Sequence, residues 1–112
     1  MEKGLADQLD EACRPLDDDG CQVYVTLDAD ACCTADVPGV GAPNPAGLRG
    51  PEVAACARRA GVSNSVSSLD LVEINPRVDR DGQSGRWAAL MIWHFLVGRA
   101  GRSRSAADSS SS

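Results

Sequence analysis

Apolar and polar positions along the chain predict a helix, a strand, a long loop, a second helix, a second strand and a final helix. Leu5, Leu9 and Ala12 recur at helical spacing among acidic residues, so residues 3–16 are expected to form an amphipathic helix. Residues 21–28 are rich in β-branched and aromatic side chains and lie between turn signals. They are predicted to form a buried strand.

The rest of the chain continues this order. Residues 29–50 are rich in proline and glycine and are expected to run as a long ordered loop. Residues 50–61 carry a proline at the first helical position, a glutamate in the first turn and a glycine at the end, which mark a helix. Residues 67–76 form a second apolar run closed by Asn-Pro. Residues 83–97 form a helix that is apolar on nearly every side and needs neighbours around most of its circumference.

These elements predict an α/β fold that the chain does not complete by itself. Two parallel strands with the helices present cannot cover both faces of a sheet and also surround an apolar helix. We therefore expect an amphipathic helix and turn in residues 1–20 and an incomplete α/β domain in residues 21–100. Residues 101–112 are expected to form a disordered, serine-rich tail.

Composition narrows the classes of partner. The formal charge of −5, from 16 acidic and 11 basic side chains, argues against nucleic acid or an anionic membrane as the main partner. The longest apolar stretch, Trp87 to Gly98, is too short to span a bilayer, and no leader pattern precedes the first helix. Five cysteines without such a pattern favour reduced thiols in the cytoplasm over a disulfide framework.

Two carboxylates at the end of the first strand are candidates for a metal site. Side chains two residues apart in a strand point to the same side, so Asp28 and Asp30 are expected to converge just past its carboxyl end. Ligands bind at that edge in open parallel sheets. An isolated pair of this kind also occurs as ordinary decoration of a strand-to-loop junction. Cys32 and Cys33 are adjacent and lack zinc-site spacing, so they are expected to be structural thiols.

The segment from Thr26 to Leu48, TLDADACCTADVPGVGAPNPAGL, favours the metal interpretation. It resembles the third metal-binding signature of the ureohydrolase superfamily, which includes arginase, agmatinase and formimidoylglutamase. The departures from that signature are Thr26 in place of serine, Ala29 in place of a larger apolar residue and Thr34 in place of proline or alanine. The residues in register are Thr26, Asp28, Asp30, Pro38, Gly39 and Gly47.

A second match lies between Leu69 and Leu90. It resembles the last strand and helix of the same family, in which a glutamate before Asn-Pro faces the substrate and a D-x-x-G-x-[ST]-[AG] turn opens the closing helix. Glu73 occupies the position of that glutamate. The two matches cover residues 23–97, and the resemblance implies the C-terminal third of a three-layer αβα arginase-like domain with a parallel sheet.

The resemblance implies metal-assisted hydrolysis of a carbon–nitrogen bond. Family members hold two manganese ions that share a hydroxide, and this hydroxide attacks a planar amidine or guanidinium carbon. On this resemblance Asp28 and Asp30 are metal ligands, with Asp28 the candidate for a bridging role. Thr26 lies behind these ligands, and Glu73 orients the substrate through charge-assisted hydrogen bonds. No residue of the chain is assigned as a catalytic acid or base.

The match stops short of a whole site. The family's Gly-Gly-x-His and Asp-x-His-x-Asp segments are missing from the sequence, and His94 lies in the apolar helix, where a satisfied helical histidine is expected rather than a ligand. We therefore expect a truncated or split gene product that is inactive alone. A complete domain is expected to form homo-oligomers.

The loop after Pro-Gly discriminates among family members. Its sequence, Val-Gly-Ala-Pro, is more similar to the corresponding loop of formimidoylglutamases than to that of agmatinases. The implied reaction is hydrolysis of N-formimidoyl-L-glutamate to L-glutamate and formamide, a step of histidine breakdown. An agmatinase- or guanidinobutyrase-type guanidino hydrolase is the alternative reaction. A non-catalytic assembly or binding module is the alternative of another class.

Overall fold

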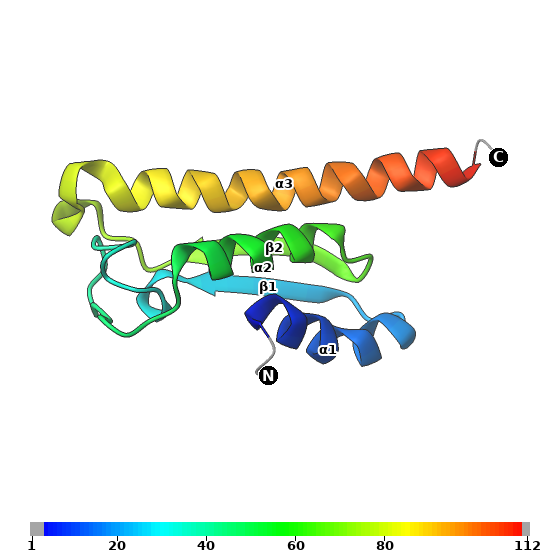
Figure 1. Ribbon diagram of the computed structural model, residues 1–112, viewed down its shortest axis with the longest axis horizontal. Coiled ribbons are helices and arrows are strands. Elements are labelled where there is room, and N and C mark those ends of the chain that lie inside the picture. The colour runs from blue at the N-terminus through cyan, green and yellow to red at the C-terminus, as the bar shows by residue number, and fades with distance from the viewer. Residues whose placement is uncertain (1–3, 111–112) are drawn as a thin grey trace.

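The computed structural model describes residues 4–110 and contains the predicted elements in the predicted order (Figure 1). Short 3-10 turns follow β1 and precede α3. No helix in the described range is long and apolar enough to cross a membrane. The helices and strands are α1 (Leu5–Asp18), β1 (Val23–Asp28), α2 (Gly50–Val62), β2 (Val66–Val72) and α3 (Gln83–Ser110).

The two strands form a parallel pair, which confirms the predicted α/β fold. Asp28, the last residue of β1, lies opposite Val72, the last residue of β2, so both strands end at the same edge. β1 is half-buried on one side and exposed on the other, so the prediction of a buried strand is wrong. Tyr24 is 59% exposed because the helices cover only one face of the sheet.

The core lies between the sheet, the long loop and the helices α2 and α3. Leu27 and Leu71 pack against it from the strands, and Val53 contributes from α2. α3 contributes Trp87 and Met91, which are 7% and 1% exposed. Figure 1 shows α3 running lengthwise beside α2, which is its main neighbour. The core therefore ties the start of α3 to the loop that follows β1.

The loop between β1 and α2 is ordered by contacts within itself, as predicted. Cys32 pairs with Leu48, and Leu48 N–H donates a hydrogen bond to the Ala31 carbonyl at 2.9 Å. Gly47 leaves no room for a side chain, because a Cβ there would lie 2.6 Å from the Cys32 carbonyl carbon. At the far end of the loop, the Asp36 carboxylate accepts a hydrogen bond from Gly50 N–H, 2.9 Å away, at the start of α2.

Part of the apolar surface of α3 is uncovered, as expected of elements that cannot surround this helix: Trp93 is 53% and Leu96 55% exposed. α3 differs from its prediction in length. The helix extends to Ser110 instead of ending near Val97, so the backbone of residues 101–110 is helical and not the disordered tail that composition predicted. An existing helix is prolonged without a new nucleus, and the residues after Val97 include good helix formers such as alanine and arginine. Residues 111–112 lie outside the described range.

Candidate functional site

The two aspartates of the first motif meet through a turn rather than through strand alternation. Asp28 ends β1 and caps a 3-10 turn, Ala29–Ala31, in which its Oδ1 accepts a hydrogen bond from Asp30 N–H at 2.9 Å. Asp30 therefore lies outside the strand, and the prediction that strand alternation would bring it together with Asp28 is wrong. This short-range hydrogen bond keeps the Asp30 backbone next to the Asp28 carboxylate at the carboxyl edge of the sheet.

Asp30 has the features of a partly formed cation site. Its Oδ1 is buried and has no hydrogen-bond partner among the described residues. A buried carboxylate oxygen without a partner is costly, and a bound cation would satisfy it. Two carboxylates are also the hard oxygen donors that manganese accepts. Residues 4–110, however, contain no group of three or more His, Cys, Asp or Glu side chains that could hold a metal ion. The residues fit part of a metal site.

Glu73 lies at the same edge of the sheet and has an unusual backbone conformation. It follows Val72, the β2 residue paired with Asp28, and its side chain is exposed. Its φ is +75°, a left-handed value that costs a non-glycine residue about 1–2 kcal/mol. Such strained residues cluster at functional sites, where the surrounding structure holds them. The geometry therefore supports a functional role for this carboxylate.

Replacing Glu73 with glycine is expected to raise the free energy of unfolding by about 0.5–1 kcal/mol, because glycine adopts a left-handed backbone without steric penalty. The matched control is Glu52→Gly in the first turn of α2, which is expected to lower it by up to about 1 kcal/mol. Urea unfolding followed by circular dichroism measures both. A loss of stability at both positions would show that Glu73 is not strained.

Thr26 lies on the uncovered face of the sheet, directly before Asp28 on that side. It is opposite Asp70 of β2, whose carboxylate accepts a hydrogen bond from the Tyr24 hydroxyl. The second oxygen of Asp70 is buried and has no partner among the described residues. Neither Tyr24 nor Asp70 was among the predicted site residues. Two signals could have found them. Tyr24 alternates with Thr26 along β1, and parallel pairing of the two strands places Asp70 opposite Thr26.

The cysteines and the histidine do not join the carboxylates as ligands. Burial, followed by the negative charges of Asp28 and Asp36, raises the pKa of the Cys32 thiol to about 11. All five cysteines are free, and none belongs to a group of three or more potential ligands among the described residues. His94 Nδ1 lies 3.1 Å from Arg58 Nη2, and its ring meets Trp93 edge to face. This supports the expectation of a satisfied helical histidine.

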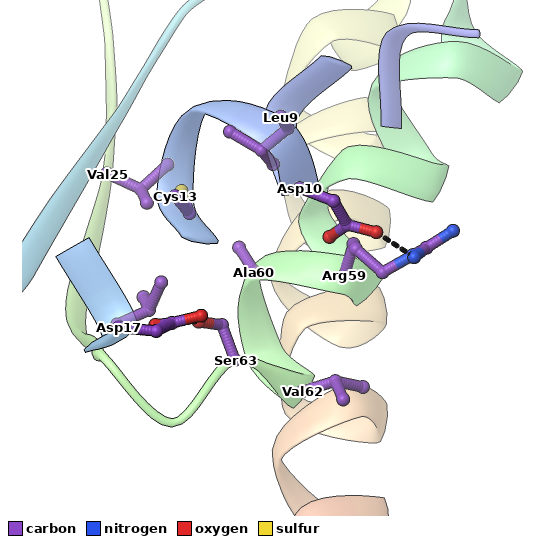
Figure 2. Close-up of a pocket in the computed structure, with 10 residues that line it drawn as sticks. Leu9, Asp10, Cys13, Asp17, Val25, Arg59, Ala60, Val62 and Ser63 are labelled. Atoms are coloured by element: carbon purple, nitrogen blue, oxygen red, sulfur yellow. Dashed lines mark hydrogen bonds and ion pairs between the residues drawn. The ribbon is translucent and has the colours of Figure 1, made fainter. Parts of the chain in front are cut away.

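A separate cavity lies away from the carboxylates, between α1, α2 and the sheet. Its volume is about 190 Å³, and Figure 2 shows Leu9 and Cys13 of α1 facing Val25 of β1 across it. Asp10 and Arg59 form an ion pair at its rim. Asp28, Asp30 and Glu73 do not line it. It is a packing gap beside α1 rather than part of the candidate site.

Comparisons with known proteins agree with both motifs. The model of the arginase family matches residues 1–98. A formimidoylglutamase of Cupriavidus pinatubonensis is 39% identical over 99 residues, which cover 86% of this chain and 30% of that protein. A formimidoylglutamase of Nocardia farcinica is 38% identical over 77 residues, covering 69% of this chain and 24% of that protein. The chain thus spans less than a third of the length of these relatives.

Solved structures give the same result. Formimidoylglutamase from Bacillus subtilis superposes with a TM-score of 0.82 at 26% identity, covering 88% of this chain and 31% of that one. A Trypanosoma cruzi formiminoglutamase determined with manganese superposes with a TM-score of 0.70 at 31% identity, covering 85% and 34%. These matches confirm the resemblance recognised from the two motifs and the fold that it implied.

Proposed function

Since this chain belongs to the arginase family, we propose that it supplies part of the site of a manganese-dependent hydrolase of linear amidines. The observation that carries the proposal is the buried, unpartnered Oδ1 of Asp30 beside Asp28 at the carboxyl edge of the sheet. The strained Glu73 next to this edge supports it.

The chain's own residues would divide the work between metal and substrate. Asp28 and Asp30 would hold manganese through carboxylate oxygens. When bound, the metal pair supplies a hydroxide nucleophile at neutral pH. Glu73 would accept hydrogen bonds from the nitrogens of an amidinium group and orient its planar carbon. Thr26, on the same face of β1 as Asp28, would support that ligand from behind.

The substrate we propose is N-formimidoyl-L-glutamate, hydrolysed to L-glutamate and formamide in histidine breakdown. Support comes from the relatives, which carry the name formimidoylglutamase. We further propose a cytoplasmic homo-oligomer for the whole enzyme. Free cysteines and the exposed apolar residues of α3, among them Trp93 and Leu96, support that part of the proposal.

Paramagnetic broadening of amide NMR signals by Mn²⁺ tests the metal site without requiring activity. Broadening is expected to concentrate at Asp28, Asp30 and Glu73, because it falls steeply with distance from the ion. Asp30→Asn is expected to weaken Mn²⁺ binding by at least about tenfold, since losing even an outer partner of a metal ligand commonly costs 10- to 100-fold. Asp19→Asn, at the end of α1, is the control and is expected to leave the affinity unchanged.

Broadening spread evenly over the acidic surface, or an Asp30→Asn variant that binds like the control, would contradict the metal assignment. The same Mn²⁺-loaded sample is expected to release no glutamate from N-formimidoyl-L-glutamate, because the described residues hold no cluster of three or more ligands. Turnover by the isolated chain would show that this chain does not need residues from elsewhere for catalysis.

A further inference from the structure

Glu73 lies at the point where the chain changes its neighbour. Up to Val72, β2 pairs with β1. Directly after Glu73, Ile74 forms an antiparallel bridge with Val40. Asn75 N–H then donates a hydrogen bond to the Gly39 carbonyl at 2.7 Å. Glu73 is thus held between two anchors, the sheet on one side and the Pro38–Gly39–Val40 turn on the other, which explains why its left-handed backbone persists.

The second anchor is itself attached to the first turn of α3. Gly39 N–H donates a hydrogen bond to Ser84 Oγ at 2.7 Å, and Ser84 is completely buried. A Cβ at Gly39 would lie 2.6 Å from the Cβ of Asp79, so only glycine lets the turn approach this closely. The position of the turn therefore depends on the place of the Ser84 hydroxyl.

Asp79 holds Ser84 in place. Its two carboxylate oxygens accept hydrogen bonds from Ser84 N–H at 2.9 Å and Gly85 N–H at 3.1 Å, which caps the start of α3. Desolvation alone would raise the pKa of Asp79. Hydrogen bonds from Ser84 and Gly85 and the positive charge of Arg86 lower it by more than desolvation raises it. The pKa of Asp79 consequently lies below its ordinary value, and the cap is ionised at neutral pH.

We propose that Ser84 is a positioning residue for Glu73. Its hydroxyl accepts a hydrogen bond from Gly39 N–H, and the Gly39 carbonyl accepts one from Asn75 N–H. Together with the pairing of β2, the position of Asn75 sets the direction of the Glu73 carboxylate. Ser84 does not touch Glu73, so its effect is transmitted through the turn. This inference rests on the proposed function of Glu73 as the substrate-facing carboxylate, but its structural content is measurable separately.

The experiment compares Ser84→Ala with Ser65→Ala. Ser65 is also buried, at 9% exposure, and its hydroxyl lies 3.1 Å from that of Ser63, outside this network. Two quantities are measured by NMR at a temperature where each variant is folded. One is the rate of amide hydrogen exchange at Gly39 and Asn75, and the other is Mn²⁺ broadening at Glu73 relative to Asp28.

Ser84→Ala is expected to speed exchange at Gly39 and Asn75 by up to about tenfold, since one hydrogen bond contributes roughly 0.5–1.5 kcal/mol. It is also expected to change the broadening at Glu73 by at least about twofold while leaving that at Asp28 unaltered. Ser65→Ala is expected to change neither. Ser84→Cys keeps the shape of the side chain but offers only a weak acceptor, so its exchange rates and broadening are expected to lie between those of the unmodified chain and Ser84→Ala. It provides a second variant if alanine prevents folding.

Unchanged exchange at Asn75 together with an unchanged Glu73 signal in a folded Ser84 variant would overturn the inference. Lack of Mn²⁺ broadening at Asp28 and Asp30 in the unmodified chain would instead overturn the metal assignment. In that case the exchange rates and the Cα chemical shift of Glu73, which reports its left-handed backbone, still decide the role of Ser84.

Discussion

Trp87→Ala is expected to lower the free energy of unfolding by about 3–5 kcal/mol, which is a large fraction of the total stability of a small domain. Trp87 is 7% exposed and packs in the core cluster with Met91 and Val37. It comes from the first turns of α3 and lies over the loop that follows β1. Removal of its ring leaves a cavity that the loop backbone cannot fill, because bridges such as Cys32 to Leu48 hold that loop in place.

Trp93→Ala provides the matched control on the same helix. Trp93 is 53% exposed and meets His94 edge to face. It also makes a cation–π contact with Arg58, whose Cζ lies 5.8 Å from the ring centroid. Its loss is expected to cost about 1 kcal/mol or less. Urea unfolding followed by far-ultraviolet circular dichroism compares the two variants without relying on tryptophan fluorescence. Equal losses would show that α3 does not bury the face that carries Trp87.

The second large effect is expected at the crossing of α2 and α3. Gly98→Ala should lower the free energy of unfolding by about 1–3 kcal/mol, the range for overpacking a tight contact. A Cβ at Gly98 would press on the Arg58 carbonyl group and lie 3.1 Å from Val62 N. On the facing helix, a Cβ at Gly61 would meet the backbone of Phe95 and Arg99. Backbone atoms cannot rotate away, so the helices themselves would have to separate.

Gly101→Ala, one turn further along α3, separates this clash from helix propensity. No atom lies within 4 Å of the Cβ position at Gly101. Alanine there is expected to stabilise the helix by about 0.5–1 kcal/mol. Thermal unfolding should therefore show a lower Tm for Gly98→Ala and a higher Tm for Gly101→Ala. A higher Tm for both variants would mean that the helix backbones are not in direct contact.

Local patterns were sufficient for the elements and for the candidate residues. Helical spacing, strand composition and the proline and glycine marks predicted the order of all five elements and the parallel pair. The resemblance to two family motifs made Asp28, Asp30 and Glu73 the candidates, and the structure places their backbone at one edge of the sheet. The extent of α3 was missed because composition does not register that a helix already formed upstream can continue without a new nucleus.

The sequence by itself therefore determined the order of the elements and the family to which the chain belongs, and it supplied the candidate site residues, since each motif acts within a few residues of backbone. Only the tertiary structure decided how they are held. The hydrogen bond from Gly39 to Ser84 joins residues 45 positions apart, and it forms only when the start of α3 packs on the loop. The left-handed Glu73 depends on that same contact, and the close approach of Gly61 and Gly98 depends on two helices meeting. Such features follow from which segments pack together, and no local pattern encodes that information.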